Sequence, residues 1–91
     1  MGMSKAVYKG LYPKRFPLNQ YPKFCDRLKV AMDIRDYTSQ KLAEKIFISA
    51  NTISMYRCGR RMPSPEVLCL IARELHVSTD FLLGLTEFIY I

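Results

Sequence analysis

The sequence predicts an all-α fold, because hydroxyl side chains precede helix-like runs and apolar residues recur within those runs at helical spacing. Thr38 and Ser49 each stand one residue before such a run. At this position a side-chain oxygen can accept a hydrogen bond from an otherwise unpaired backbone N–H of the first turn. Residues 37–59 are therefore expected to form two short helices joined by a tight turn.

A first helix is expected before this pair, from about Pro22 to Ile34. Its inner face carries four apolar residues at helical spacing, namely Phe24, Leu28, Ala31 and Met32. The two helices of the pair should each bury one face as well. The residues expected on those two faces are Leu42, Ala43, Ile46, Ile53 and Tyr56. The small side chain of Ala43 permits a close crossing where the two helices meet.

Two more helices are expected after the pair. Ser64 caps the first of them, and Pro65 stands at its first position, where the missing N–H costs nothing. Its inner face carries Leu68, Ile71, Ala72 and Leu75. Ser78 caps a short last helix that runs through Leu83 and is closed by Gly84.

The outer face of the second helix of the pair is polar but uncharged. A surface helix usually carries Lys and Glu there, whereas this helix has no charge before Arg57. Asn51 and Thr52 can form hydrogen bonds with base edges, while Ala50 and Met55 can pack on a thymine methyl group. Such a face after a capped turn is typical of a helix-turn-helix that reads DNA.

An ordered series of residues matches a known family pattern without insertion. The series is Phe24, Arg27-Leu-Lys29, Thr38, Leu42-Ala-Glu-Lys-Ile46, Ser49, Thr52-Ile-Ser54, Gly59-Arg-Arg61, Pro63-Ser64, Leu68, Ile71-Ala72, Leu75, Val77-Ser78, Asp80 and Leu82-Leu-Gly84. In these residues the segment 24–84 resembles the Xre-type helix-turn-helix family, the fold of small phage repressors and Cro proteins. The resemblance implies a compact five-helix, lambda-repressor-like domain.

The sequence departs from the family pattern at four positions. Phe47 stands where the turn commonly has Gly, and a left-handed backbone there would cost about 1 kcal/mol. Ala50 replaces a frequent Gln or Arg, so one strong base contact is absent. Arg57 replaces a frequent Glu, and Cys58 replaces a frequent Asn or Arg. The operator sequence therefore cannot be transferred from relatives.

From these residues and the resemblance together, we expect roles for individual residues when the second helix of the pair lies in the major groove. The expected base contacts come from Ala50, Asn51, Thr52 and Met55. Phosphates would be held by Ser39, Gln40, Arg57, Arg60 and Arg61, which set the register without reading sequence. The two residues of the preceding helix begin it, and a helix N-terminus can hold a phosphate. The alternative roles are helix initiation for Asn51 and Thr52, surface packing for Met55, and solvated loop charges for Arg60 and Arg61.

The net charge of +6 is unevenly distributed along the 91 residues. Residues 1–24 contain five Lys or Arg and no acid, whereas residues 25–91 are almost neutral. Pro13, Pro17 and Pro22 disfavour helix in this region, so residues 1–22 are expected to form an extended basic arm. The arm would attract DNA at long range. Its aromatic residues leave packing on the core as an alternative to contact with DNA.

Composition excludes several other classes of protein. No apolar run approaches the roughly 20 residues that span a bilayer, and the N-terminus lacks the apolar core of a signal peptide, so a cytoplasmic protein with no membrane contact is expected. Cys25, Cys58 and Cys69 lack metal-ligand spacing. No nucleophile–base pair is visible. We therefore expect no catalytic residue, no metal, no cofactor and no small-molecule ligand.

The last residues, 85–91, form an apolar tail rich in β-preferring side chains. The tail can pack on its own chain, join a second subunit, or remain without a partner, and the sequence leaves these three options open. The predicted organisation is thus an arm over 1–22, a helix-turn-helix domain over 23–84, and a short β-prone tail over 85–91.

Together these features predict a sequence-specific double-stranded DNA-binding protein that is not an enzyme. It is expected to be a repressor-like transcriptional regulator that binds a partly palindromic operator as a homodimer. The alternative is a protein-interaction module, such as an antitoxin or adaptor, that uses exposed apolar residues to dock on a protein partner. Met55, Leu70 and the tail are the residues that this alternative would use.

Overall fold

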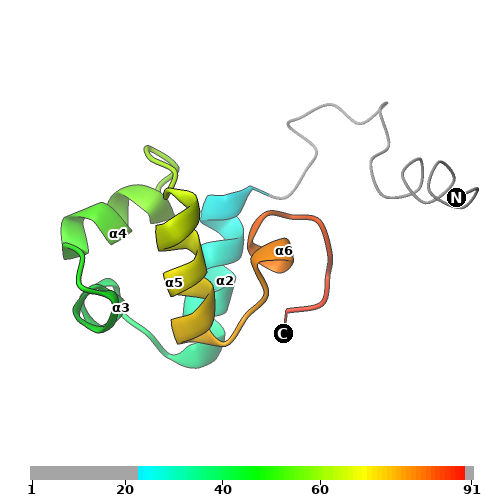
Figure 1. Ribbon diagram of the computed structural model, residues 1–91, viewed down its shortest axis with the longest axis horizontal. Coiled ribbons are helices and arrows are strands. Elements are labelled where there is room, and N and C mark those ends of the chain that lie inside the picture. The colour runs from blue at the N-terminus through cyan, green and yellow to red at the C-terminus, as the bar shows by residue number, and fades with distance from the viewer. Residues whose placement is uncertain (1–22, 90–91) are drawn as a thin grey trace, which may run out of the picture.

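Five α-helices account for the regular structure in residues 23–89, the part of the chain that the computed structural model describes. With the labels of Figure 1, they are α2 (Phe24–Arg35), α3 (Ser39–Ile46), α4 (Ala50–Arg57), α5 (Pro65–Leu75) and α6 (Thr79–Leu82). No strand occurs within 23–89. The all-α fold class is confirmed. The predicted basic arm, residues 1–22, lies outside the described residues.

The helices form two ends joined by a middle layer (Figure 1). One end consists of α3 and α4, and the other consists of α6 with the segment that follows it, while α2 and α5 lie between them. Contacts between helices follow this arrangement, since α3 packs against α4 and α5, and α2 packs against α4, α5 and α6. The α3–α4 pair therefore rests on a platform made by α2 and α5.

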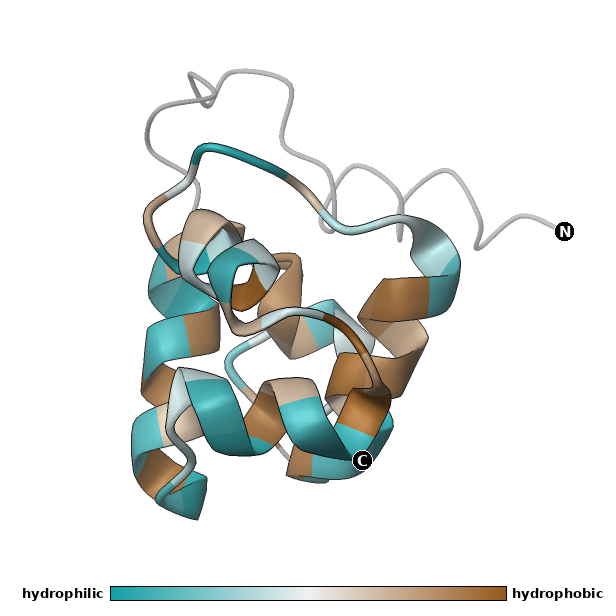
Figure 2. Cartoon of the chain, turned by 90° about the vertical axis from the view of Figure 1, so that its left-hand side faces the viewer, coloured by the Kyte–Doolittle hydropathy of each residue, from teal (hydrophilic) through white to brown (hydrophobic). Residues whose placement is uncertain are grey.

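The core is built from the apolar faces that the sequence predicts. Figure 2 shows the helices banded in hydrophobic and hydrophilic colours, as expected when each helix buries one face. All the predicted inner-face residues are buried except Leu68, which is half-buried and packs against the core's edge. Three residues outside those predicted faces complete the core, namely Val77, Phe81 and Leu82.

Arg27 is a buried charge that the sequence did not predict. Its side chain lies on α2 with 8% of the residue's surface exposed. The guanidinium carbon lies 4.3 Å from the centre of the Phe81 ring, and Nη2 forms an ion pair of 3.0 Å with Glu87 Oε2. These contacts compensate part of the cost of burying the charge, and they connect α2 to the end of the chain.

All four predicted hydroxyl caps are present. The side-chain oxygens of Thr38, Ser49, Ser64 and Ser78 accept hydrogen bonds from the backbone N–H three residues later, at 3.0, 3.0, 3.2 and 3.0 Å. Replacing such a cap with Ala typically costs about 1 kcal/mol. Only α2 among the described helices lacks a side-chain cap, because Lys23 precedes it. The first helix runs from Phe24 to Arg35 where about Pro22 to Ile34 is expected from the sequence, and the last helix ends at Leu82 instead of Leu83.

Three of the five described helices end in a left-handed residue that is not glycine. Asp36, Phe47 and His76 have φ values of 59°, 62° and 55° at the ends of α2, α3 and α5. A side chain in this conformation costs about 1 kcal/mol or more relative to Gly. The strain expected at Phe47 if the turn required a positive φ is therefore present in the structure.

The described part of the tail folds back on its own chain and contains no strand. The Ser78 N–H donates to the carbonyl oxygen of Ile89 at 2.8 Å, and its Oγ donates to that of Phe88 at 3.2 Å. Ile89 packs against the core, whereas Phe88 is 81% exposed. Residues 85–89 thus contact their own chain and still present one aromatic ring to solvent.

Candidate nucleic-acid interface

A tight turn sets the geometry of α3 relative to α4. Phe47 reverses the chain, and the Ile48 N–H then bonds the Ala43 carbonyl at 3.1 Å, while the Ile48 side chain packs against the core. Ser49 caps α4 immediately afterwards. Because Ile53 and Tyr56 are buried beneath α4, the opposite face of this helix must point to solvent.

Asn51 is the most available hydrogen-bonding side chain at the start of α4. It is exposed, and its Nδ2 lies 3.8 Å from the Met55 sulfur, which is a weak acceptor. The amide oxygen and the second N–H of Asn51 have no partner among residues 23–89. Met55 is half-buried beside it. An amide in this state can form the paired hydrogen bonds that adenine offers in the major groove.

The other two predicted base-reading residues are less available. The Thr52 hydroxyl lies 2.8 Å from the Ser49 hydroxyl, so one of its hydrogen-bonding positions is engaged within the cap. Ala50 is half-buried and packs partly against the core. The structure therefore leaves Asn51 with the largest free polar group of the four.

The N-terminus of α3 meets the C-terminus of α4 through Arg57. Arg57 Nη1 donates to Ser39 Oγ at 2.9 Å, and Gln40 beside it is exposed. Thr38 satisfies the Lys41 N–H, whereas the N–H groups of Ser39 and Gln40 have no partner in the described part of the chain. Two free N–H groups beside a guanidinium form a site suited to a phosphate.

Arg60 and Arg61 lie directly beyond α4, where the chain turns back. Gly59 adopts a φ of 80°, and the N–H groups of both arginines approach the Met55 carbonyl oxygen at 2.9 and 3.4 Å. Their side chains are exposed, and neither forms an ion pair within 23–89. The structure therefore places these two cations at the opposite end of α4 from its Ser49 cap.

A hollow that sequence reasoning missed adjoins Arg57. It has a volume of about 280 Å³ and is lined by Lys29, Ser54, Arg57 and Cys58. Lys29 comes from α2, and only the packing of α2 against α4 brings it to this place. Local sequence pattern contains no signal for such a juxtaposition.

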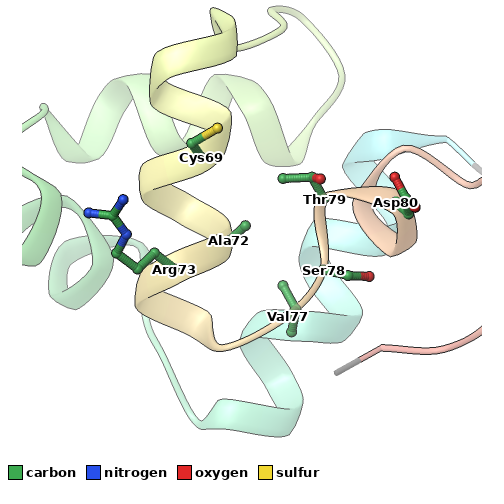
Figure 3. Close-up of a pocket in the computed structure, with 7 residues that line it drawn as sticks. All are labelled: Cys69, Ala72, Arg73, Val77, Ser78, Thr79 and Asp80. Atoms are coloured by element: carbon green, nitrogen blue, oxygen red, sulfur yellow. The ribbon is translucent and has the colours of Figure 1, made fainter. Parts of the chain in front are cut away.

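A second hollow, of about 340 Å³, lies between α5 and the start of α6. Figure 3 shows the residues that line it, with the Arg73 guanidinium pointing away from Thr79. Ser78 is already engaged with Phe81 and Phe88. The hollow thus has few free polar groups that converge, and we assign no ligand to it.

The described residues contain neither a metal-binding cluster nor a membrane-spanning helix. No group of three His, Cys, Asp or Glu side chains in 23–89 could hold a metal ion. In the same part of the chain, no helix combines the length and the apolar character needed to cross a membrane.

Comparison with known proteins identifies the fold's family. A family model described as helix-turn-helix matches residues 28–82, from the middle of α2 to the end of α6. The chain belongs to the helix-turn-helix family. This match confirms the Xre-type resemblance, and it includes the whole α3–α4 pair with the connection that carries Arg60 and Arg61.

Two relatives from Bacillus subtilis (strain 168) share this helix-turn-helix region. The uncharacterized HTH-type transcriptional regulator YobD is 34% identical over 64 residues, which is 70% of this chain and 57% of YobD. The HTH-type transcriptional regulator ImmR is 39% identical over 61 residues, which is 67% of this chain and 48% of ImmR. The chain thus spans about half the length of the curated relatives it matches.

Proposed function

We propose that this protein is a DNA-binding transcriptional regulator, without enzymatic activity, that inserts α4 into the major groove of a specific duplex site. The observation that carries the proposal is the exposed, uncharged polar face of α4, which has a free amide at Asn51 and cations only towards its end. Both curated relatives bear the names of HTH-type transcriptional regulators, which supports this assignment. Such a protein would act in the cytoplasm.

In this proposal Asn51 supplies the main hydrogen bonds to a base edge. Met55 and the exposed part of Ala50 would contact a thymine methyl group, and Thr52 would contribute whatever hydrogen-bonding capacity its pairing with Ser49 leaves. A side chain that reads a base should affect specific binding far more than random binding.

The phosphates on the two sides of the groove would be held by different groups. Ser39, Gln40 and Arg57 would hold the backbone near the start of α3, and Arg60 and Arg61 would hold it beyond the end of α4. These contacts set the position of α4 but carry no sequence information.

The finer part of the proposal is a homodimer on a partly palindromic operator. Two recognition helices face the same side of the duplex when half-sites lie about 10–10.5 bp apart or at a multiple of that spacing. Exposed apolar side chains at the α6 end, such as Phe88 and Leu85, support a contact between subunits there. These same side chains also support the second candidate function, a module that docks on a protein partner.

Salt-dependent binding separates the two functions. The full chain is titrated with random duplex DNA and with sites selected from a random pool, at several salt concentrations. With about 5–8 phosphate contacts per dimer, log K should fall linearly with log salt with a slope of roughly −4 to −7. Arg60→Ala combined with Arg61→Ala should weaken selected and random duplexes alike. Binding that ignores salt would reject DNA as the partner and favour the protein-docking function.

A further inference from the structure

The hollow beside α4 has two cations on its rim that come from different helices. Lys29 belongs to α2 and Arg57 to α4, and the lining also contains the Ser54 hydroxyl and the Cys58 thiol. The volume of about 280 Å³ is many times the roughly 30 Å³ of one water molecule, so the hollow has room for a phosphate group. Lys29, Ser54 and Arg57 each contribute a side-chain donor, as an anion requires, whereas the Cys58 thiol already donates to the Met55 carbonyl oxygen at 3.5 Å.

Arg57 is held in place and is not a freely moving surface cation. Its Nη1 donates to Ser39 Oγ at 2.9 Å, and its Nε is buried without a partner within the described residues. A guanidinium anchored at one nitrogen has fewer conformations to lose when another nitrogen binds an anion. Arg57 therefore connects the free N–H groups of α3 with the hollow and can serve both.

Lys29 has no competing partner among residues 23–89. It is exposed, and the one salt bridge in that range joins Arg27 to Glu87. The nearest carboxylates along α2 belong to Asp26 and Asp33, and neither lines the hollow. The rim is thus positive, with no acid facing it, although the domain as a whole is almost neutral.

The hollow also adjoins the helix that would enter the groove. Ser54 is exposed on α4 one turn after Asn51 and one turn before Arg57. A duplex that places a base edge against Asn51 brings one of its two phosphate strands alongside α4. The strand on the Ser39 side would then pass the rim of the hollow, since Arg57 borders both.

We propose that Lys29 and Arg57 together clamp one backbone phosphate of the bound duplex, which makes α2 part of the DNA interface. This inference rests on the proposed function, because the phosphate is a diester of the DNA that α4 reads. Lys29 acts through charge and adds affinity without selectivity. With Lys29 included, the proposed phosphate-binding surface beside α4 extends past Ser39 and Gln40, the two residues that begin α3.

The test compares Lys29→Ala with Lys45→Ala in the full chain. Both residues are exposed lysines on helices, and Lys45 lies in the last turn of α3, outside the hollow. One lost phosphate contact should reduce the salt slope by about 0.9 for each bound subunit and lower affinity about eightfold at 0.1 M salt, on selected and random duplexes alike. Lys45→Ala should leave the slope unchanged, and Lys29→Arg should restore the wild-type slope. Circular dichroism confirms that each variant is folded.

The outcomes distinguish this inference from the proposed function. A wild-type chain that does not bind duplex DNA rejects the proposed function itself. A wild-type chain that binds, with a Lys29→Ala variant whose slope equals that of wild type, overturns only the clamp. A loss confined to selected sites would also overturn it, because a phosphate contact acts on every sequence.

Inorganic phosphate has the same charged oxygens as a backbone phosphate, and a separate experiment tests whether it is the ligand of the hollow. Inorganic phosphate is titrated into the wild-type chain against chloride at matched ionic strength, and amide shifts of Ser54 and Cys58 are followed by NMR. Equal effects of the two salts support the duplex phosphate as the ligand. Saturable shifts with phosphate alone, lost in Lys29→Ala while the salt slope for DNA stays unchanged, would assign the hollow to a free anion and overturn the clamp.

Discussion

The α3–α4 end and the α6 end of the molecule differ in the polar side chains that they expose. At the first, the exposed side chains include Asn51, Arg60 and Arg61 together with the apolar Phe47, whereas at the second they include Leu85, Phe88 and the acidic Glu87. These two ends lie on opposite sides of α2 and α5 (Figure 1). A polar, cationic surface suits a nucleic acid, and an exposed apolar surface gains from burial against protein. The comparison indicates that the proposed DNA contact and the proposed subunit contact can be changed separately.

Both ends are nevertheless attached to the same helix. Arg57 and Lys29 border one hollow between α4 and α2, and Arg27, two residues earlier on α2, binds Glu87 near the end of the chain. Arg27 and Lys29, both on α2, therefore make their polar contacts towards different ends of the molecule. Variants that affect only one end are the way to establish how independent they are.

The first expected effect is at the α4 end. Asn51→Ala should cost about 1–3 kcal/mol of binding free energy on the preferred site, roughly a 5- to 150-fold loss, because the amide that we propose as the base reader is removed. Thermal unfolding should change little, since the side chain is exposed and bonds only weakly to Met55. Binding titrations on selected and random duplexes measure the difference. An equal loss on both would mean that Asn51 is not a base reader.

Substituting two neighbouring tail residues, one exposed and one facing the core, tests the α6 end more sharply than deleting the whole tail. Phe88→Ser removes an exposed ring, so it should leave folding stability within about 0.5 kcal/mol while reducing dimer mass in sedimentation. If that ring is buried between subunits, association should weaken by about 1.5–3 kcal/mol, and paired half-sites should lose more affinity than single ones.

Ile89→Ala is the matched variant on the side that faces the core. Ile89 is half-buried and packs against the core, so its truncation should lower the free energy of unfolding by about 1–2 kcal/mol. Association should change little. If Phe88→Ser left sedimentation unchanged, the dimer contact would have to involve another surface, and Leu70 on α5, which is 39% exposed, is the next candidate.

The sequence predicted what depends on local chemistry. Hydroxyl caps and apolar spacing are read within one or two turns of helix, which is why Ser49, Ser64 and the inner faces of α3 and α4 were predicted correctly. The family pattern then supplied the order of the helices. The predicted site residues Ser39 and Arg57 prove to be hydrogen-bonded to each other, although their separate assignment to phosphates gave no reason to expect that pairing.

Long-range pairings could not be predicted in this way. Arg27 is buried against Phe81 and forms an ion pair with Glu87, and both of these residues lie far from it in the sequence. Lys29 gains its place beside Arg57 only through the packing of α2 on α4. The tail's β-preferring composition likewise did not indicate that Ser78 would bond the carbonyl oxygens of residues 88 and 89. Such contacts depend on residues distant in sequence, for which composition carries no signal.

Replacing a left-handed residue with glycine should have a smaller effect of opposite sign, namely a gain in folding stability. Phe47 follows α3 with a φ of 62° and is 92% exposed, so Phe47→Gly removes strain and almost no packing. The variant should be more stable by about 1 kcal/mol, which raises the melting temperature by roughly 4–8 °C for a domain of this size. His76→Gly, after α5, is the matched control at the other end and should show a similar gain. A Phe47→Gly variant that melts lower would assign a packing role to the exposed ring.

The smallest expected effect concerns the hydrogen bond that attaches the start of α3 to α5. The Tyr37 hydroxyl donates to Glu74 Oε2 at 2.6 Å, and this bond to a carboxylate raises the pKa of Tyr37 above its usual value of 10.0. The folded chain thus keeps a proton that the unfolded chain releases, so this contribution is fully present below pH 10 and is lost as pH rises through the raised pKa.

Tyr37→Phe should cost roughly 0.5–1.5 kcal/mol at pH 7, towards the lower value because the bond is only part-buried. The Lys41 ammonium, 4.4 Å from the centre of the Tyr37 ring, can keep its contact with Phe. Denaturant unfolding of both proteins from pH 7 to 11 measures the difference, and subtracting the curves removes the other tyrosines. The difference should shrink above pH 10, and a gap that stayed constant to pH 11 would show that the hydroxyl's proton is not what stabilises this end.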